Sequence, residues 1–283
     1  MPYFENTTLS ASSRSQYEKK LSQWEEHTNT PLRELAADPE AAVQKLRSIS
    51  SIAQTPTNRH LYLSAMVAYV THVSKDKLDK WKELQKENSE PLSEHYASNE
   101  PTEKQKDKVM DWDTIQSIRT SLPHGSQERL LLTFYTCMEP VRADYYATEI
   151  IAEGEESKEE NYIELSTPPR LVVRDFKTKT KYEKIENTLP KEVEDELRAS
   201  LENMPRTYLF VGEDKKTPFV RKLYSNWACR TVTRVLHQPM TLTVLRHLYI
   251  SQKIREETPL QEMKEVAKKM GHSREMQRGY DWS

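Results

Sequence analysis

The chain has 283 residues, enough for one large or two ordinary domains, and its formal net charge at pH 7 is −2. Charged residues make up 30% of the sequence and only 5 residues are glycine, a composition that favours a helix-rich protein over a β-sandwich. Neither a run of about eighteen apolar residues nor a basic-then-apolar N-terminus occurs, so no membrane span or secretory signal is predicted. Cys137 and Cys229 lack metal-ligand spacing and are too few for a disulfide framework, which predicts an intracellular, reducing compartment.

The N-terminal third carries helical patterns. In the stretch Ser12–His27, Tyr17, Leu21 and Trp24 are spaced i, i+4, i+7 behind serine residues that can cap a helix. Further helices are expected after Pro31, after Pro39 and over Arg59–Val73. Residues 1–84 are therefore predicted to form a compact helical domain.

A polar stretch follows this domain. Residues 85–108 read Q-K-E-N-S-E-P-L-S-E-H-Y-A-S-N-E-P-T-E-K-Q-K-D-K and offer almost nothing to bury. Such a composition is typical of a linker. We therefore predict a second domain over residues 109–283.

The second domain is predicted to combine helices with a small antiparallel sheet. Arg142, in M-E-P-V-R-A-D-Y-Y, follows a proline and is expected near the start of a helix. The other predicted helices are Trp112–Ser121, Ser126–Cys137, Lys191–Asn203 and a segment from Phe219 onward. The predicted strands are Tyr162–Leu165, Arg170–Phe176 and Lys181–Thr188, the last two joined by the lysine-rich K-T-K-T. The fold class is mainly α with a small antiparallel β-sheet.

The last forty or so residues concentrate chemistry-bearing side chains. Arg246 lies in a helical pattern that places its guanidinium beside the apolar face of Leu242, Leu245 and Ile250. A helix is expected to end at Met270-Gly271, since glycine adopts the left-handed conformation at little cost.

His272 follows this glycine, and Tyr280 lies eight positions further on. From Lys215 to Ser283 there are fourteen Lys and Arg against six Asp and Glu, a local net charge of +8. Arginine, imidazole and phenol converging in a basic region point to a phosphodiester substrate, although a solvated helical surface could also produce the local charge.

Five motifs in one order carry a resemblance. The series M-E-P-V-R-A-D-Y-Y, V-V-R-D-F-K-T-K-T-K-Y, L-T-V-L-R-H, M-G-H-S and a late tyrosine resembles the tyrosine recombinase (phage-type integrase) family. The resemblance is strongest to the divergent branch of large DNA viruses and eukaryotic mobile elements. It covers nearly the whole chain, because the N-terminal helices resemble the core-binding domain with which that family clamps DNA.

The resemblance implies a role for each matching residue. Arg142 and Arg246 match the arginines that hold the scissile phosphate, a task suited to planar guanidinium. Lys177 matches the hairpin lysine that protonates the leaving 5′-oxygen. His272 matches the histidine that binds the phosphate, and Tyr280 matches the nucleophile.

Three positions leave alternatives open. Lys179 is a credible substitute for the hairpin lysine. Thr243 stands where most of the family has a histidine; its hydroxyl can donate a hydrogen bond to a phosphate but cannot carry a proton charge. Asp144 is either a partner that fixes Arg142 or a charge at the N-terminus of a helix.

The reaction implied is cleavage and rejoining of DNA through a 3′-phosphotyrosine, which conserves the bond energy without metal or ATP. The expected partner is double-stranded DNA, bound by a tetramer as in the family, in the nucleus or a viral replication compartment. The alternatives are a type IB topoisomerase-like enzyme, a DNA-binding relic of a recombinase without activity, and an all-helical scaffold. A scaffold would leave the basic C-terminal third and the order of the five residues as coincidence.

Overall fold

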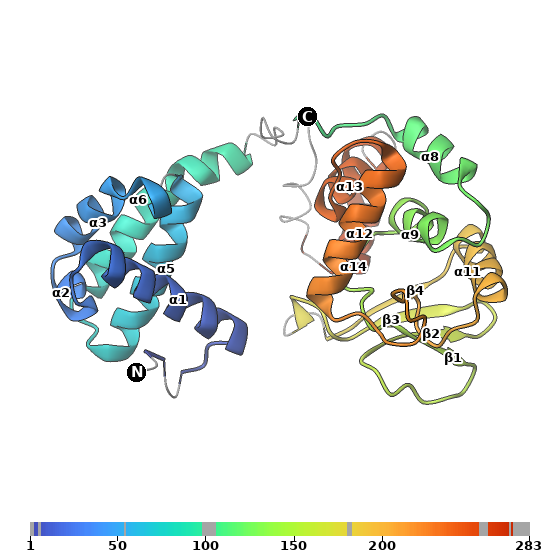
Figure 1. Cartoon of the computed structure of the whole chain (residues 1–283), viewed down its shortest axis with the longest axis horizontal. Helices are drawn as coiled ribbons and strands as arrows, with labels where there is room; N and C mark the ends of the chain where they lie inside the picture. The colour runs from blue at the N-terminus through green and yellow to red at the C-terminus, as the bar shows by residue number, and fades with distance from the viewer. Residues whose placement is uncertain are drawn as a thin grey trace. The chain divides into compact units, whose positions relative to one another are not determined.

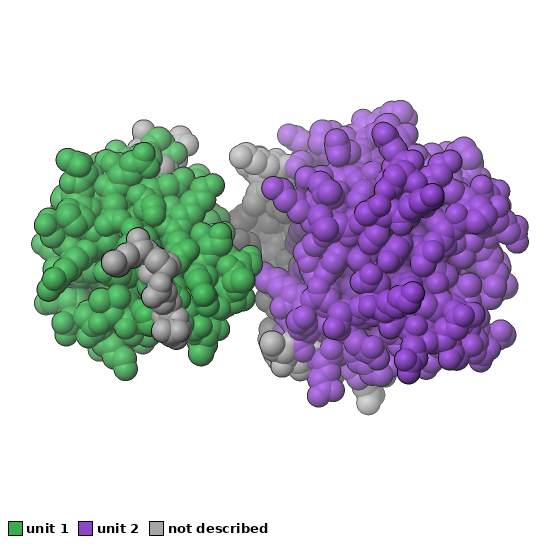
Figure 2. Space-filling model, turned by 60° about the horizontal axis from the view of Figure 1, so that its bottom comes forward, with its two compact units in different colours: residues 1–98 green, residues 99–283 purple. Residues whose placement is uncertain are grey.

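The computed structural model describes residues 3–4, 7–53, 55–97, 106–179, 183–254, 260–271 and 273. The chain divides into two compact units, residues 1–98 and 99–283, which are coloured separately in Figure 2. In the described part of the chain, no helix is long and apolar enough to cross a membrane.

Unit 1 is a helical bundle (Figure 1). Its helices are α1 (Ala11–Thr28), α2 (Leu32–Ala37), α3 (Pro39–Ser48), α4 (Ser50–Ala53), α5 (Pro56–Val73) and α6 (Leu78–Ala97). The side chains of Ser10, Asp38 and Thr55 accept backbone hydrogen bonds at the starts of α1, α3 and α5. Helices therefore begin close to the positions that the sequence predicts.

Aromatic packing forms the core of unit 1. Trp24, on the predicted apolar face of α1, is fully buried with Tyr62 of α5 and Trp81 of α6. The Trp24 ring meets the other two edge to face, with centroids 6.1 and 6.0 Å apart. This geometry favours the aromatic quadrupoles and fixes α1 against α5 and α6.

The predicted linker of residues 85–108 is wrong over residues 85–97, which continue helix α6. Polar side chains attach this part of the helix to α5. Gln85 donates to the Ser64 hydroxyl at 2.8 Å, and the buried Asn88 accepts from Arg59 Nε at 3.0 Å. A polar composition favours a linker, but amide side chains can be buried when they are hydrogen-bonded, as Gln85 and Asn88 are here.

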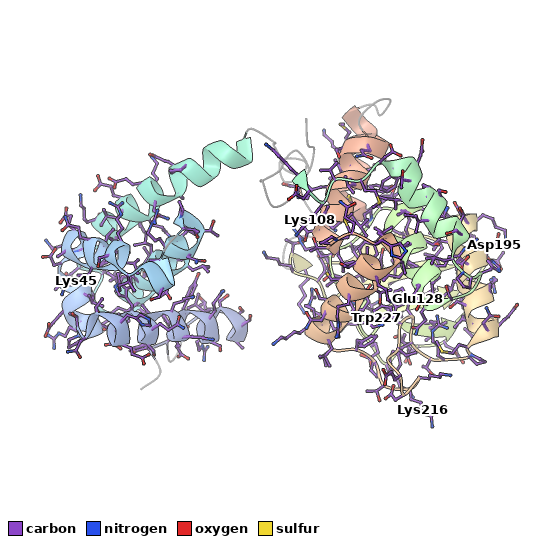
Figure 3. All side chains as sticks on the ribbon, turned by 45° about the horizontal axis from the view of Figure 1, so that its top comes forward. Lys45, Lys108, Glu128, Asp195, Lys216 and Trp227 are labelled. Carbon is purple, nitrogen blue, oxygen red and sulfur yellow. The ribbon has the colours of Figure 1, made fainter. Side chains whose placement is uncertain are left out.

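Unit 2 combines helices with one sheet (Figure 1). Its helices are α8 (Trp112–Ser121), α9 (Gln127–Thr136), α11 (Lys191–Asn203), α12 (Arg221–Leu236), α13 (Leu242–Leu248), the π-helix η1 (Tyr249–Ile254) and α14 (Leu260–Lys269). Its strands are β1 (Glu149–Ala152), β2 (Asn161–Leu165), β3 (Arg170–Val173) and β4 (Ile185–Thr188). Charged side chains such as Asp195 and Lys216 project from its surface (Figure 3). The predicted fold class, mainly α with a small sheet, is confirmed.

The sheet has the order β1-β2-β3-β4. The three predicted strands β2, β3 and β4 pair antiparallel, as expected. The sequence did not predict β1, which pairs parallel with β2 and makes the sheet mixed. On its other side, Ile150 N–H donates to the Thr207 carbonyl at 2.7 Å, so the short strand is held from both sides.

The connection between β3 and β4 is longer than predicted. β3 ends at Val173, because the Asn161 side-chain oxygen accepts from the backbone N–H groups of Arg174 and Asp175 at 3.0 and 2.9 Å. These side-chain bonds turn the chain after the strand, while Arg174 N–H also donates to the Glu160 carbonyl at 3.3 Å. Residues 174–179, here called the lysine loop, carry Lys177, and β4 begins only at Ile185.

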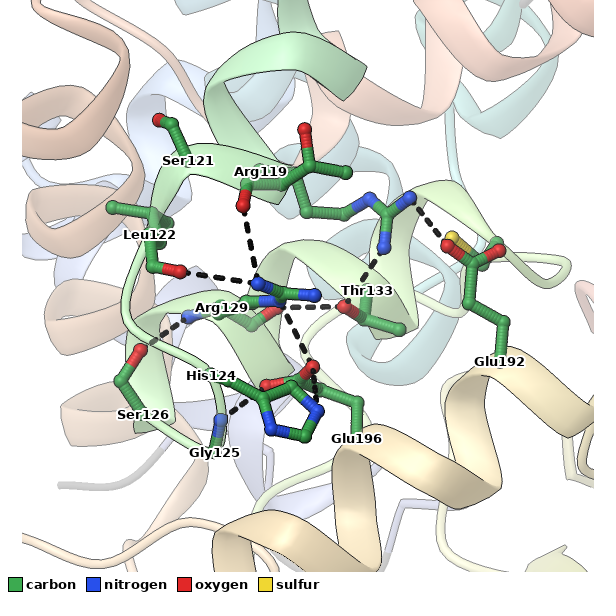
Figure 4. A network of polar contacts seen from close by, with 12 residues as sticks. Arg119, Ser121, Leu122, His124, Gly125, Ser126, Arg129, Thr133, Glu192 and Glu196 are labelled. Carbon is green, nitrogen blue, oxygen red and sulfur yellow. Dashed lines mark hydrogen bonds and ion pairs between the residues drawn. The ribbon is translucent and has the colours of Figure 1, made fainter.

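A buried carboxylate attaches the turn between α8 and α9 to α11 (Figure 4). Glu196 accepts from the Gly125 N–H at 2.8 Å and pairs with Arg129 Nε at 2.9 Å. Gly125 has φ +74°, and a Cβ there would lie 2.7 Å from the Ala199 carbonyl oxygen, so only glycine fits. The network fixes α9, which leads directly into the segment of Arg142.

Candidate functional site

Arg142 lies in a turn that follows α9. The prediction that it begins a helix is wrong, since residues 142–147 form bends and turns before β1. The Tyr135 hydroxyl, on a fully buried ring of α9, donates to the Arg142 carbonyl at 2.5 Å. A buried phenol needs such a partner, and here it fixes the backbone of the turn. The Arg142 side chain itself is half-buried.

Arg246 reaches the same turn from α13. The Thr241 hydroxyl caps this helix by accepting from Val244 N–H at 3.2 Å. Arg246 is 1% exposed, and its Nη1 donates to the carbonyl of Pro140, two residues before Arg142. The predicted burial of the guanidinium beside an apolar face is confirmed. Thr243, one turn earlier, is exposed.

Asp144 lies in the same turn, two residues after Arg142. It is 2% exposed and forms an ion pair with Arg221, the first residue of α12. Burial raises the pKa of Asp144, while the positive charges of Arg221, Arg246 and Arg142 act in the opposite direction. No helix follows Asp144 within residues 142–148, so the interpretation of this residue as a helix-terminal charge is wrong. It is a buried partner of arginines.

The two candidate lysines of the lysine loop differ in their contacts. Lys179 Nζ pairs with the Asp175 carboxylate at 3.0 Å, and the Tyr146 hydroxyl donates to the same carboxylate. Lys177 is exposed in the turn, and the described residues provide it with no ion pair or hydrogen bond. Lys179 thus stabilises the loop, whereas Lys177 is accessible to an external anion.

The end of α14 lies against the lysine loop. Gly271 has φ +69°, which confirms the predicted left-handed turn after the helix. Thr178 donates its hydroxyl to the Gly271 carbonyl at 2.6 Å. Lys269 pairs with Glu139 at 3.0 Å, which attaches the same helix end to the segment before Arg142.

Five segments of the chain therefore meet in unit 2. They are the turn of Arg142, the lysine loop, the start of α12, helix α13 and the end of α14. Three of the five predicted catalytic residues, Arg142, Lys177 and Arg246, lie on them. The other two, His272 and Tyr280, lie outside the described residues.

The contacts that join these segments involve residues that the sequence analysis missed. Arg221 pairs with Asp144 and also donates to the Asp175 carbonyl at 3.2 Å. Asn161 donates to the carbonyls of Asp144 and Asp175 at 2.9 and 3.3 Å. These side chains have no spacing that marks them. The only sequence signal is a pair of basic residues, Arg221-Lys222, at a helix start, where basic residues are unfavourable.

Comparison with known proteins gives a match among solved structures but none by sequence. No family model matches the chain, and no curated protein matches its sequence. Among solved structures, the chain is similar to XerA recombinase, with 12% sequence identity and a TM-score of 0.45. This similarity covers 96% of this chain and 88% of the XerA chain.

Proposed function

We propose that this protein is a DNA strand transferase that acts through a covalent phosphotyrosine, as a site-specific recombinase does. The observation that carries the proposal is a set of contacts that joins three segments: Arg246 donates to the Pro140 carbonyl beside Arg142, and Arg221 links Asp144 to the Asp175 carbonyl of the lysine loop. These segments are separated by up to about a hundred residues, and each carries a residue that the resemblance matches to the family.

The arginines supply the electrostatic part of the reaction. A phosphodiester resists attack because its anionic oxygens repel a nucleophile, and guanidinium groups neutralise the charge that grows in the transition state. Arg246 donates to the Pro140 carbonyl, and the Arg142 carbonyl accepts from the Tyr135 hydroxyl, so both residues are positioned by the fold. Such preorganised donors cost little reorganisation when the reaction occurs.

The lysine loop supplies a proton donor. Lys177 is the better candidate, because Asp175 already neutralises Lys179. In the proposed reaction the Tyr280 oxygen attacks phosphorus and passes its hydroxyl proton to His272. The bond from phosphorus to the 5′-oxygen breaks, that oxygen leaves with a proton from Lys177, and a 3′-phosphotyrosine forms. Attack by a 5′-hydroxyl reverses these steps and rejoins a strand.

Unit 1 is proposed to hold part of the duplex. It carries twelve Lys and Arg against thirteen Asp and Glu, so its net charge supplies no general attraction to DNA. Local basic side chains would have to make the phosphate contacts. The fall of affinity with salt grows with the number of phosphates neutralised, so the whole chain should show a steeper fall than residues 109–283 alone.

The direct test is capture of a covalent complex. The protein is incubated with a random-sequence library of nicked duplexes that trap the cleaved state, and protein-linked DNA is isolated under denaturing conditions. The proposal predicts a metal-independent adduct whose DNA shares a sequence. Recovery of no linked DNA would contradict the proposed function.

Arginine variants make the test specific. Arg142→Lys and Arg246→Lys are expected to lower the adduct rate by about 10²–10³-fold, the loss that follows removal of one transition-state donor. Binding of the same duplex, measured by gel shift, should change little. Arg198→Lys on α11, where the exposed arginine pairs with Glu194 at 2.8 Å, serves as the matched control.

A further inference from the structure

Arg221 joins two of the segments that carry proposed catalytic residues. One Nη atom pairs with the carboxylate of Asp144, and the other donates to the carbonyl of Asp175 at 3.2 Å. Its guanidinium also lies over the Tyr146 ring, 4.8 Å from the centroid. One side chain thus links the turn that follows Arg142 to the loop that carries Lys177.

The location of Arg221 is unfavourable for its helix. It is the first residue of α12, the next residue is Lys222, and the first turn contains no acidic residue. Positive charge at a helix N-terminus opposes the helix dipole. Arg221 therefore does not stabilise the start of its own helix. Its favourable contacts are the ones that it makes outside α12.

Asp144 needs a cation other than the proposed catalytic arginines. A carboxylate that is 2% exposed is costly unless it is paired. The groups that act on it electrostatically are the guanidiniums of Arg221, Arg246 and Arg142 and the buried phenols of Tyr135, Tyr145 and Tyr224. Without Arg221, the remaining cations that act on the carboxylate would be Arg142 and Arg246, and the carboxylate would compete with a phosphate for the half-exposed Arg142.

We propose that Arg221 is a positioning residue of the strand-transfer site: it neutralises Asp144, so that this carboxylate does not compete with the phosphate for Arg142, and it holds the lysine loop at Asp175. This inference rests on the proposed function. Arg221 itself is not proposed to contact the reacting atoms.

The test compares adduct rates at saturating nicked duplex, so that changes in DNA affinity do not enter. Arg221→Met removes both polar contacts at similar length and is expected to slow adduct formation by about 10–100-fold, the usual effect of losing such a supporting partner. Arg221→Lys keeps the charge and should recover part of the rate. The matched control is Arg234→Met at the other end of α12, where the arginine pairs with Glu128 at 3.0 Å and should leave the rate unchanged.

A double-mutant cycle tests whether Arg221 acts through Asp144. If it does, Arg221→Met combined with Asp144→Asn should be little slower than Arg221→Met alone, because the second change removes an already broken contact. The inference would be overturned if the rate losses of the two single variants multiplied in the double variant.

The pH profile provides a readout that a purely structural role would not move. The Arg221 charge lowers the pKa of Asp144 against the effect of burial, so its removal should shift the acid limb of the adduct rate to higher pH. The Asp144→Asn protein should lack that shift. The inference would be contradicted if Arg221→Met kept both the adduct rate and the acid limb of the parent.

Trypsin cleavage after Lys177 provides a readout independent of activity. Arg221→Met should be cut there faster than the parent and the Arg234→Met control, because the loop loses its bond at Asp175. Equal cutting would overturn the positioning role. A parent that forms no adduct contradicts the proposed function, whereas an active parent with an equally active Arg221→Met contradicts only the inference.

Discussion

The hydroxyl of Thr178 donates to the carbonyl of Gly271 at 2.6 Å. Thr178 is the neighbour of Lys177, the proposed proton donor, and Gly271 immediately precedes His272, the proposed phosphate ligand. The bond therefore joins the lysine loop to the helix end from which the last proposed catalytic residues continue. The position of the lysine loop is therefore coupled to the position of the chain at Gly271.

Thr178→Val should slow adduct formation by roughly 2- to 10-fold, the rate equivalent of one neutral hydrogen bond of about 0.5–1.5 kcal/mol. Thr178→Ser keeps the hydroxyl and should retain most of the rate. Single-turnover adduct formation on the selected duplex measures both. Equal rates for valine, serine and parent would show that the bond does not contribute to the site.

Gly271→Ala should destabilise unit 2 more than Gly154→Ala does. Both glycines have positive φ, +69° and +80°, so alanine is strained at either place by about 1–2 kcal/mol. At Gly271 a Cβ would also lie 2.7 Å from Ile185 Cδ1, whereas nothing lies within 4 Å at Gly154. Overpacking of this kind costs about 1–3 kcal/mol more.

Urea unfolding of the two glycine variants measures the difference, since both share the backbone strain. A lower midpoint for Gly271→Ala with an unchanged slope is expected. Equal midpoints would mean that Ile185 moves aside without cost, and that the close approach of α14 to β4 does not limit stability.

Glu196→Gln should cost about 2–3 kcal/mol of stability, because it removes the charge that partners the largely buried Arg129 (Figure 4). Glu202→Gln, at an exposed position of the same helix α11, is the matched control and should be neutral. Thermal or urea unfolding measures both. Equal stability of the two variants would show that the buried network contributes nothing.

The pH dependence of stability should depend on two sheet carboxylates. Hydrogen bonding by the Gly154 N–H and Arg170 lowers the pKa of Glu164, and Lys184 lowers the pKa of Glu186. A lowered folded-state pKa stabilises the fold above the unfolded value of about 4.3, and this contribution is lost as pH falls through the folded value.

Glu164→Gln combined with Glu186→Gln should therefore flatten the loss of melting temperature between about pH 5 and pH 3. The comparison requires low salt, since exposed pairs are screened at high ionic strength. A double variant that loses stability as steeply as the parent would exclude these two carboxylates as the source.

Local patterns in the sequence predicted most helices of unit 2, since capping residues and apolar spacing act over a few neighbours. The predicted bounds Trp112–Ser121 and Lys191–Asn203 are those of α8 and α11. Strand β1 was missed, because the four residues Glu149–Ala152 are stabilised by β2 and by Thr207 from distant segments. Tertiary contacts of this kind leave no local pattern.

In the candidate site, too, residues that belong to a sequence motif could be predicted, and residues that act through tertiary contacts could not. The family resemblance supplied Arg142, Lys177 and Arg246, which lie on segments that meet. It did not supply Arg221 or Asp175, because a bridging contact depends on the fold rather than on spacing. Tyr249, another tyrosine of the C-terminal region, is 3% exposed and packs edge to face on Trp112 with centroids 5.8 Å apart. It is therefore part of the core.

The identity of the residue bound to DNA tests the central claim most directly. The captured adduct is digested with trypsin and nuclease, and the peptide that carries the phosphonucleotide is identified by mass spectrometry. We predict a phosphotyrosine at Tyr280, and Tyr280→Phe should bind the same duplex with unchanged affinity yet form no adduct. An adduct that persists in Tyr280→Phe, or a linkage mapped to any other residue, would contradict the account.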